Sequence, residues 1–390
     1  LGYIGLPTAS LLATKGYAVT GVDVSQKVVD TINRGEIHIV EPDLDILVKS
    51  AVNSGNLTAS LEPVAADVFI IAVPTPFKGD HVPDLSYIES ATRAICPFLK
   101  SGNLVILEST SPVGTTDEVV ARILTEEGKK VGEDIYVAHC PERVLPGRIL
   151  VELIENDRVI GGVNEESTQQ AVDFYEEFVR GDVLATTAKT AEMVKLTENS
   201  SRDVQIAFAN EVSMICDSES INTWEVIELA NRHPRVNILN PGPGVGGHCI
   251  AVDPWFIVDR SPEQSRLIRT AREVNDSKPE WVIERVKKYA DKFKSPVIAC
   301  LGLAFKADVD DLRESPAFEI VKKLKELNLG ELLVCEPNLK EHEDFELCSV
   351  DEAIKKADIV LLLVDHKKFR GLKAAELGEK VVIDTRGVIK

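Results

Sequence analysis

The feature of this sequence that most constrains its fold is an alternation of short β-branched apolar runs with longer helical stretches, which occurs twice along the 390 residues. Parallel strands joined by crossover helices produce this pattern, because the helices cover both faces of the sheet. In the first half of the chain we expect parallel strands at 18–24, 68–73, 104–108, 135–139 and 158–161. We expect helices at 7–15, 26–33, 85–99 and 116–127.

A long helical pattern separates the two alternating regions. It runs from about 187 to 217 with few helix breakers, and a second helical stretch follows at 271–293. The second set of strands is expected at 297–303, 332–335, 359–364 and 381–384. The sequence therefore predicts an α/β protein with two Rossmann-like, doubly wound domains joined by a central helical domain. We place the domains at 1–186, 187–294 and 295–390, each long enough to bury its own core.

The overall charge excludes one class of partner. The formal net charge is −19, whereas binding to a nucleic-acid backbone needs a basic face. An anionic small ligand must therefore meet local clusters of cations. No apolar run approaches the roughly 20 residues of a membrane helix and no secretory signal opens the sequence, so we expect a cytoplasmic protein without a membrane partner.

The seven cysteines suggest neither a disulfide framework nor a metal site. Their number is odd and no pair has CxxC spacing, so most are expected to be reduced residues of the core. No group of His, Cys and Asp residues has the spacing of metal ligands. We therefore expect no bound metal.

The first residues match part of a dinucleotide-binding turn. Gly2 and Gly5 correspond to the second and third glycines of G-x-G-x-x-G, which bring the backbone close to a pyrophosphate at the start of a helix. Asp23 follows at the end of an expected strand, where its carboxylate binds the ribose hydroxyls of NAD and disfavours the extra phosphate of NADP. The first glycine and the preceding strand would lie before Leu1, so we expect an omitted segment of about 6 to 10 residues.

A glycine-rich loop carries the sharpest chemical signal. Four glycines within 241–247 come just before Cys249, and such a loop passes close to a ligand and leaves the sulfur accessible. A thiolate in this setting attacks an aldehyde carbon. Lys195 and Asn199 share one face of a predicted helix, where an ammonium and an amide suit an oxyanion. From spacing alone, the alternatives stay open that Lys195 is a solvated surface lysine and that Asp253 caps a turn.

Several segments together resemble the UDP-glucose/UDP-mannose dehydrogenase superfamily, most closely its UDP-N-acetyl-D-mannosamine dehydrogenases. The likeness extends over essentially the whole chain. The segments that carry it lie at 1–7, 72–76, 108–114, 141–147, 192–199, 231–254 and 305–316.

The resemblance implies both an architecture and a reaction. It implies an NAD-binding Rossmann domain, a central helical domain that forms a homodimer, and a UDP-binding carboxyl-terminal domain. The implied reaction is a four-electron oxidation of the C6 alcohol of a UDP-sugar to the uronic acid, with two NAD⁺ and one water. It would pass through a thiohemiacetal and a thioester on a cysteine. The expected protein is an NAD-dependent UDP-sugar 6-dehydrogenase of polysaccharide biosynthesis.

The resemblance also assigns roles to individual catalytic residues. Cys249 matches the nucleophile, and Asp253 matches the acid near the attacking water. Lys195 and Asn199 match the pair that holds the developing oxyanion. Glu142 matches a glutamate that orders water for hydrolysis of the thioester.

Cofactor and substrate contacts follow from the same resemblance. Thr110 matches a hydroxyl beside the nicotinamide and the water, and it completes the implied catalytic set. The implied cofactor contacts are Gly2, Gly5, Asp23, Thr75, Thr110 and Arg313. The implied substrate contacts are Arg143, Lys195, Asn199, Arg235, Gly246 and Lys306.

The identity of the sugar is less constrained than the reaction. Arg235 lies in a basic stretch before the glycine loop and would act across the dimer, with an exposed basic turn as the alternative. The segments 235–256 and 74–80 look like those of the mannosamine-type enzymes, so UDP-N-acetylmannosamine is the expected substrate. UDP-N-acetylglucosamine and UDP-glucose stay open as alternatives. Two other classes are an inactive homologue that senses NAD or UDP-sugars, and a 6-phosphogluconate-type dehydrogenase, which needs no cysteine.

Overall fold

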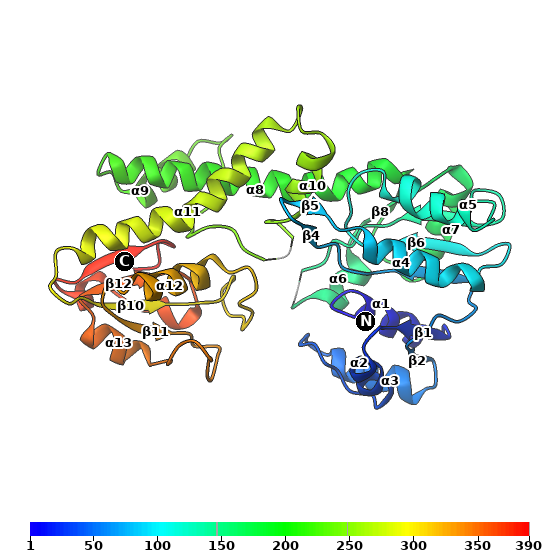
Figure 1. Ribbon diagram of the computed structural model, residues 1–390, viewed down its shortest axis with the longest axis horizontal. Coiled ribbons are helices and arrows are strands. Elements are labelled where there is room, and N and C mark those ends of the chain that lie inside the picture. The colour runs from blue at the N-terminus through cyan, green and yellow to red at the C-terminus, as the bar shows by residue number, and fades with distance from the viewer. Residues whose placement is uncertain (146, 248, 390) are drawn as a thin grey trace. The chain divides into compact units, whose positions relative to one another are not determined.

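The computed structural model describes residues 1–145, 147–247 and 249–389 (Figure 1). The chain divides into two compact units, Leu1–Glu198 and Asn199–Lys390. The long helix α8, Ala188–Ser218, begins in the first unit and ends in the second. Within the described ranges, no helix is both long and apolar enough to cross a membrane.

A buried sheet forms the centre of the first unit, with the strand order β3-β6-β7-β8-β9. Its strands are β3 Val68–Ile71, β6 Leu104–Leu107, β7 Tyr136–His139, β8 Arg158–Gly162 and β9 Val183–Thr187. Successive residues of β6 point to opposite faces: Leu104 and Ile106 join one hydrophobic core, and Val105 joins the other. Burial on both faces is what makes a central strand read as a continuous apolar run.

Helices cover both faces of this sheet. One core includes residues of α1 Gly5–Thr14, α6 Ile149–Glu155 and α7 Glu165–Glu176. The other includes residues of α4 Ser86–Ile95, the π-helical turn η2 Thr116–Ala121 and α5 Arg122–Glu126. The 3-10 turn η1 Cys96–Phe98 follows α4 directly. This arrangement confirms the α/β class that the alternating pattern predicts.

A smaller layer completes the first unit. Strands β1 Val19–Val22 and β2 Leu57–Ser60 pair in parallel, and a separate core packs them against α1, α2 Gln26–Asn33 and α3 Leu44–Asn53. Strands β4 Phe77–Lys78 and β5 Val82–Pro83 form a short antiparallel hairpin.

One strand direction differs from the prediction. We expected parallel strands throughout the first half, but β8 runs antiparallel to β7, with Ala138 opposite Gly162 and His139 opposite Gly161. The connection between them contains only the seven-residue helix α6, and an antiparallel partner needs no crossover to the far end of the sheet. The segment after β7 therefore stays at the carboxyl end of that strand.

The second unit has a fully parallel sheet in the order β11-β10-β12-β13. Its strands are β10 Val297–Leu301, β11 Glu331–Cys335, β12 Ile359–Leu362 and β13 Val381–Asp384 (Figure 1). Along β10, Ile298 and Cys300 join one core whereas Ala299 and Leu301 join the other. This is the second doubly wound pattern that the sequence predicts.

Helices again supply both cores of the second unit. The helices that follow α8 in the described part of this unit are α9 Thr223–Ala230, α10 Asp253–Arg260, α11 Arg266–Ala290, α12 Pro316–Leu327, α13 Val350–Lys356, the 3-10 turn η3 Lys367–Phe369 and α14 Ala374–Leu377. Residues of α11 and α12 pack on one face of the sheet, and residues of α13 and α14 pack on the other.

Buried polar groups join α8 to α11 inside the second unit. Arg272 donates to Asp203 at 2.6 Å, and both side chains are 1% exposed. Asn275 also donates to Asp203 at 2.8 Å and accepts from Asn210 at 2.9 Å. Burial raises the pKa of Asp203 against the opposing effect of Arg272. The contact between the two helices therefore depends on the pairing of a buried charge.

We expect Arg272→Ala to destabilise the second unit by about 3 to 5 kcal/mol, because the substitution leaves the buried Asp203 carboxylate without its cation. Urea unfolding followed by circular dichroism measures this loss. Arg285 on the same helix is a matched control, since its pair with Asp217 is partly exposed at 26% and 34%, and Arg285→Ala should cost about 1 kcal/mol or less. Equal losses for the two variants would contradict the assignment.

Candidate active site

The loops at the carboxyl ends of neighbouring strands carry several predicted residues of the first unit. Thr75 follows β3, Thr110 follows β6 and Glu142 follows β7, and these strands are adjacent in the sheet. The Ser109 hydroxyl accepts from the Val73 amide at 2.8 Å and so ties two of the loops together. Ligands of open α/β sheets bind at this edge.

The predicted dinucleotide turn lies at the start of α1. Gly5 is the first residue of that helix, and a side chain at Gly2 would meet no atom within 4 Å. Asp23 follows β1 directly, and its carboxylate accepts from the Ser25 amide at 2.9 Å. The turn thus combines the amino end of a helix, open space and an acid, which are the parts that a dinucleotide needs.

Two buried contacts hold Glu142. Its Oε2 accepts from Arg158 Nη1 at 2.8 Å, with the two side chains 6% and 2% exposed. Its Oε1 accepts from the backbone amide of Arg143 at 2.6 Å. The Arg143 guanidinium pairs with Glu198 of α8 at 2.6 Å. The carboxylate that the sequence assigns to water activation is therefore fixed in place by a cation on its own sheet.

The loop that carries Thr110 is fastened to α8. Glu192 Oε2 accepts from the Gly114 amide at 2.5 Å, and Glu192 Oε1 accepts from the Thr116 amide at 2.8 Å and its hydroxyl at 2.6 Å. Burial raises the pKa of Glu192, although these three donors oppose the shift. The π-helical turn η2 begins at Thr116, and such turns are frequent at functional sites.

In the second unit, Cys249 lies one turn before α10. It is exposed, and its carbonyl accepts from the amides of Val252 at 3.0 Å and Asp253 at 2.8 Å. Asp253 is the first residue of α10 and is 4% exposed. Its carboxylate accepts from Asn199 Nδ2 at 2.5 Å. The structure thus brings three predicted catalytic residues together, and Lys195 lies one turn earlier in α8.

Close packing explains the glycines that precede Cys249. A Cβ at Gly246 would lie 2.2 Å from the Glu314 carbonyl oxygen and 2.6 Å from Pro316 Cδ. Gly247 has φ +85°, a conformation that favours glycine. The amide of Gly242 donates to Asn210 of α8 at 2.8 Å. His248 of this loop lies outside the described residues, and Arg235 is exposed in the segment after α9.

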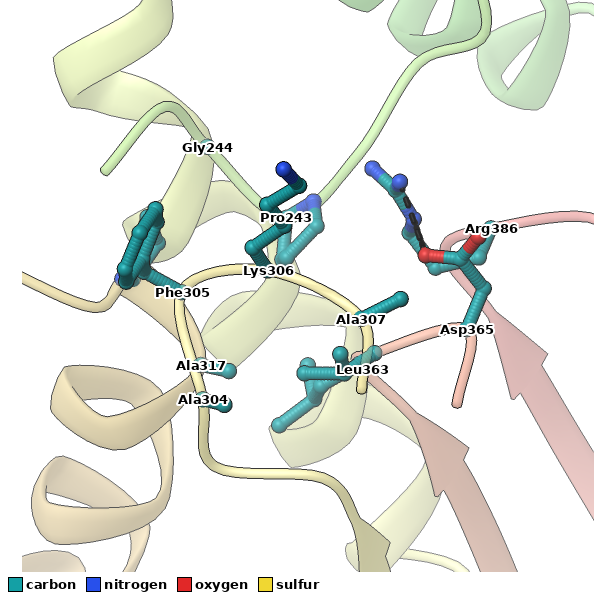
Figure 2. A pocket seen from close by; sticks show the side chains of 12 residues that line it. Pro243, Gly244, Ala304, Phe305, Lys306, Ala307, Ala317, Leu363, Asp365 and Arg386 are labelled. Carbon is teal, nitrogen blue, oxygen red and sulfur yellow. Dashed lines mark hydrogen bonds and ion pairs between the residues drawn. The ribbon is translucent and has the colours of Figure 1, made fainter. Parts of the chain in front are cut away.

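A pocket with two cations lies at the carboxyl edge of the second sheet (Figure 2). Its space of about 300 Å³ is partly open to solvent, and Lys306 and Arg386 line it. Pro243 of the glycine loop lines it too. Arg386 pairs with Asp365 at 2.9 Å. Burial acts to raise the pKa of Asp365, but the Arg386 guanidinium holds it below its usual value.

Arg386, Arg158 and Glu198 are functional candidates that the sequence reading missed. A usable signal marks Arg386 in the sequence, because it lies two residues after strand β13 and the carboxyl ends of parallel strands bind ligands. No such signal marks Arg158 and Glu198 in the sequence, because only the side chains that they contact in the fold indicate a functional role. Arg313, a predicted cofactor contact, is exposed and pairs with Asp311 at 2.6 Å.

No group of three or more His, Cys, Asp and Glu side chains in the described ranges is arranged to hold a metal ion. In the same part of the chain, which includes all seven cysteines, no disulfide is formed.

Family models match three consecutive parts of the chain. They describe the NAD binding domain, the central domain and the UDP binding domain of the UDP-glucose/GDP-mannose dehydrogenase family, at residues 1–179, 189–277 and 299–390. The second sugar nucleotide in the family name is thus GDP-mannose, where we expected UDP-mannose.

Known proteins are similar over the whole chain. An NDP-N-acetyl-D-galactosaminuronic acid dehydrogenase of Ralstonia solanacearum is 60% identical and covers 100% of this chain and 94% of its own length. A UDP-N-acetyl-D-mannosamine dehydrogenase of Escherichia coli K12 is 56% identical, with coverage of 100% and 97%. The solved UDP-N-acetyl-mannosamine dehydrogenase of Staphylococcus aureus has a TM-score of 0.91 at 45% identity, with coverage of 100% and 94%.

We expect iodoacetamide to alkylate Cys249 at least about tenfold faster than any other cysteine, because thiol reactivity follows access and ionisation. Cys249 is exposed, whereas Cys348 is half-buried and burial raises the pKa of its thiol. Peptide mass spectrometry at short labelling times measures the order of reaction. Labelling of Cys348 before Cys249 would contradict the structure.

Proposed function

This chain belongs to the UDP-glucose/GDP-mannose dehydrogenase family, and from that premise we propose that it oxidises the C6 alcohol of UDP-N-acetylmannosamine to the carboxylate. The observation that carries the proposal is the exposed thiol of Cys249, placed one turn before Asp253, whose carboxylate is bonded to Asn199. A nucleophile, an acid and an amide donor on rigid elements suit a covalent oxidation of an aldehyde.

Residues of the first unit suit the cofactor NAD. The matched domain is an NAD binding domain, and Gly2 and Gly5 leave room at the start of α1. We assign Asp23, the residue after β1, to the ribose hydroxyls. Thr75 Oγ1 is buried and has no hydrogen-bond partner among the described residues, so it is available to a ligand. We assign Thr110 and Arg313 as further contacts. When bound, NAD⁺ accepts the hydride in each of the two oxidations.

The proposed chemistry centres on Cys249. Its thiolate adds to the C6 aldehyde and forms a thiohemiacetal, whose oxidation leaves a thioester. The Lys195 ammonium and the Asn199 amide stabilise the negative oxygen that develops on that carbon. Each sugar then requires two NAD⁺ and one water, and yields one carboxylate, two NADH and three protons.

Hydrolysis of the thioester needs a base beside water. We assign this role to Glu142, whose carboxylate is held by the Arg158 guanidinium at 2.8 Å. Asp253 acts as the second acid near the water and is positioned by its bond with Asn199. Arg143, paired with Glu198 on α8, contacts the substrate.

The pocket of the second unit suits the UDP group. It lies mostly within the part of the chain that matches a UDP binding domain. Lys306 and Arg386 supply the positive charge that a diphosphate requires. Because the net charge of the chain is −19, an anionic ligand must bind at a local group of cations such as this one. Gly246 lets the loop pass against α12, and Arg235 is assigned to the substrate from a second copy of the chain.

Two names among the relatives bear on the sugar. The Escherichia coli and Staphylococcus aureus proteins act on UDP-N-acetylmannosamine by name, which supports our first choice. The Ralstonia protein at 60% identity is named for N-acetylgalactosaminuronic acid, so UDP-N-acetylgalactosamine is the second candidate. UDP-N-acetylglucosamine and UDP-glucose are further alternatives.

We expect two NADH per UDP-N-acetylmannosamine consumed, since a single oxidation would stop at the aldehyde. We expect Cys249→Ala to lower kcat about 1,000-fold or more, because the covalent route is lost. NADH absorbance under limiting sugar measures the ratio, and intact-mass spectrometry after rapid quenching should detect an acyl adduct on Cys249.

Cys348→Ala is the control and should change kcat by less than about twofold, because the Cys348 thiol contacts Cys335 and the Val334 carbonyl, to which no role is assigned. Assay of all four UDP-sugars side by side identifies the substrate by the highest kcat/KM. Product formation without any adduct on Cys249 would refute the covalent mechanism, and a silent, sensing homologue would produce no NADH with any of them.

We also propose that the second unit carries the surface of a homodimer. Phe208 and Ile215 are seven residues apart on α8, which places them near one face, and they are 55% and 54% exposed. Leu229 of α9 is 63% exposed. Large apolar side chains exposed along one helix are typical of a surface that a partner covers, and a second copy of the chain agrees with the dimer that the family resemblance implies.

We expect Phe208→Glu to weaken the dimer at least about 30-fold, because a two-fold interface buries the new charge twice. Sedimentation equilibrium over a range of concentrations measures the dissociation constant. Ile46→Glu on α3 is the control, since Ile46 is 66% exposed but belongs to the first unit. A wild-type chain that sediments as a monomer would refute this surface.

A further inference from the structure

A second buried carboxyl group lies beside the pair of Glu142 and Arg158. Glu108 directly follows β6 and is 2% exposed. Its Oε1 accepts from the hydroxyl of Tyr175 on α7 at 2.7 Å. Its Oε2 is buried and has no hydrogen-bond partner among the described residues. All four residues belong to the first unit.

The cations and donors around the two carboxyl groups are distributed unequally. Glu142 receives the charged Arg158 guanidinium and a backbone amide, whereas the side chain of Glu108 receives the neutral hydroxyl of Tyr175. The Arg158 Nη2 donates to the Leu153 carbonyl at 3.0 Å, and its guanidinium lies 5.8 Å from the centre of the Tyr175 ring. One cation cannot neutralise two buried carboxylates. This environment therefore favours the protonated form of Glu108.

Every titratable group that faces Glu108 supports this distribution. Burial and the charge of Glu142 raise the pKa of Glu108 to about 7, while the Tyr175 hydrogen bond and Arg158 act to lower it. Cys140, just after β7, stays a neutral thiol because burial raises its pKa to about 12. The pKa of Tyr175 is raised well above its usual value by burial. Glu108 therefore changes its charge near neutral pH.

We propose that Glu108 is a positioning residue whose proton controls the charge beside Glu142, so that hydrolysis of the thioester speeds up when Glu108 loses this proton. The inference rests on the role of base proposed for Glu142. A second negative charge next to Glu142 increases its affinity for the proton that it takes from water, and a stronger base reacts faster. Glu108 itself touches neither substrate nor cofactor in this proposal.

The proton on Glu108 is observable without catalysis. Infrared difference spectra of the wild type against Glu108→Gln should show a protonated carboxyl band at about pH 6 that disappears at about pH 9, since the transition is centred near pH 7. Glutamine keeps the shape of the side chain and an oxygen for Tyr175. Absence of the band at the lower pH would overturn the proposal.

The kinetic test follows the acyl adduct on Cys249 by rapid quenching and intact-mass spectrometry at several pH values. In the wild type, decay of the adduct should accelerate about threefold to tenfold through a transition near pH 7, because a base gains at most about tenfold per pKa unit. In Glu108→Gln this transition should vanish. In Tyr175→Phe it should move to higher pH, because the hydrogen bond that favours ionised Glu108 is lost.

A matched control separates this role from general damage to the fold. Tyr17 in the same unit also donates to a carboxylate, that of Glu177, but this pair is exposed. Tyr17→Phe should leave the pH of the transition unchanged, and a shift as large as that of Tyr175→Phe would overturn the proposal. A purely structural effect would lower rates at every pH without moving the midpoint.

The double variant Glu108→Gln/Glu142→Gln tests whether Glu108 acts through Glu142. Its adduct should decay at the rate of Glu142→Gln alone at each pH, because coupled residues are not additive. If Glu108→Gln changes the rate equally in both backgrounds, the proposal is wrong. If no adduct forms on Cys249, the proposed function fails and the inference fails with it. If an adduct forms but its decay has the same pH midpoint in all variants, the inference is wrong and the proposed function stands.

Discussion

Hydrogen bonds from polar residues of one helix hold the loops on which the proposed chemistry depends. On α8, Glu192 binds the loop after β6, and Glu198 binds the arginine that follows Glu142. Further along, Asn199 binds the first residue of α10, and Asn210 binds the glycine loop. Because helical residues have fixed spacing and direction, α8 sets the position of each loop within its own unit. These loops have no regular secondary structure, and their contacts with α8 fix their positions.

Much of the architecture is predictable because parallel sheets have simple requirements. Strands such as Leu104–Leu107 are buried on both faces and therefore read as apolar runs. Ligands bind at the carboxyl ends of such strands, and the fold places Thr75, Thr110 and Glu142 at one such edge, although in the sequence only the family resemblance singles these residues out. Strand direction is harder to predict. The run at Arg158–Gly162 identifies a strand, but nothing in its side chains distinguishes a parallel partner from the antiparallel one that it has.

The polar residues that support the site could not be predicted from the sequence. Arg158 and Glu108 stand at the ends of apolar strands, where a charged residue ordinarily faces solvent. Only the fold shows that they are buried, that Arg158 pairs with Glu142, and that Tyr175 of α7 binds Glu108. Cys249 was identifiable because its signal is local: four glycines and a cysteine lie within ten residues.

The regularity of α8 has a consequence for how the sequence of this chain changes over evolution. One inserted residue turns the rest of an α-helix by about 100°, so an insertion between Glu192 and Glu198 would aim one of the two side chains away from its loop. The same holds between Asn199 and Asn210. Substitutions on the outer surface of α8 leave these angles intact. Lineages descended from a common ancestor should therefore keep the length of the helix and vary at the surface positions of α8 that have no assigned contact, while gaps and insertions accumulate in the loops beyond it.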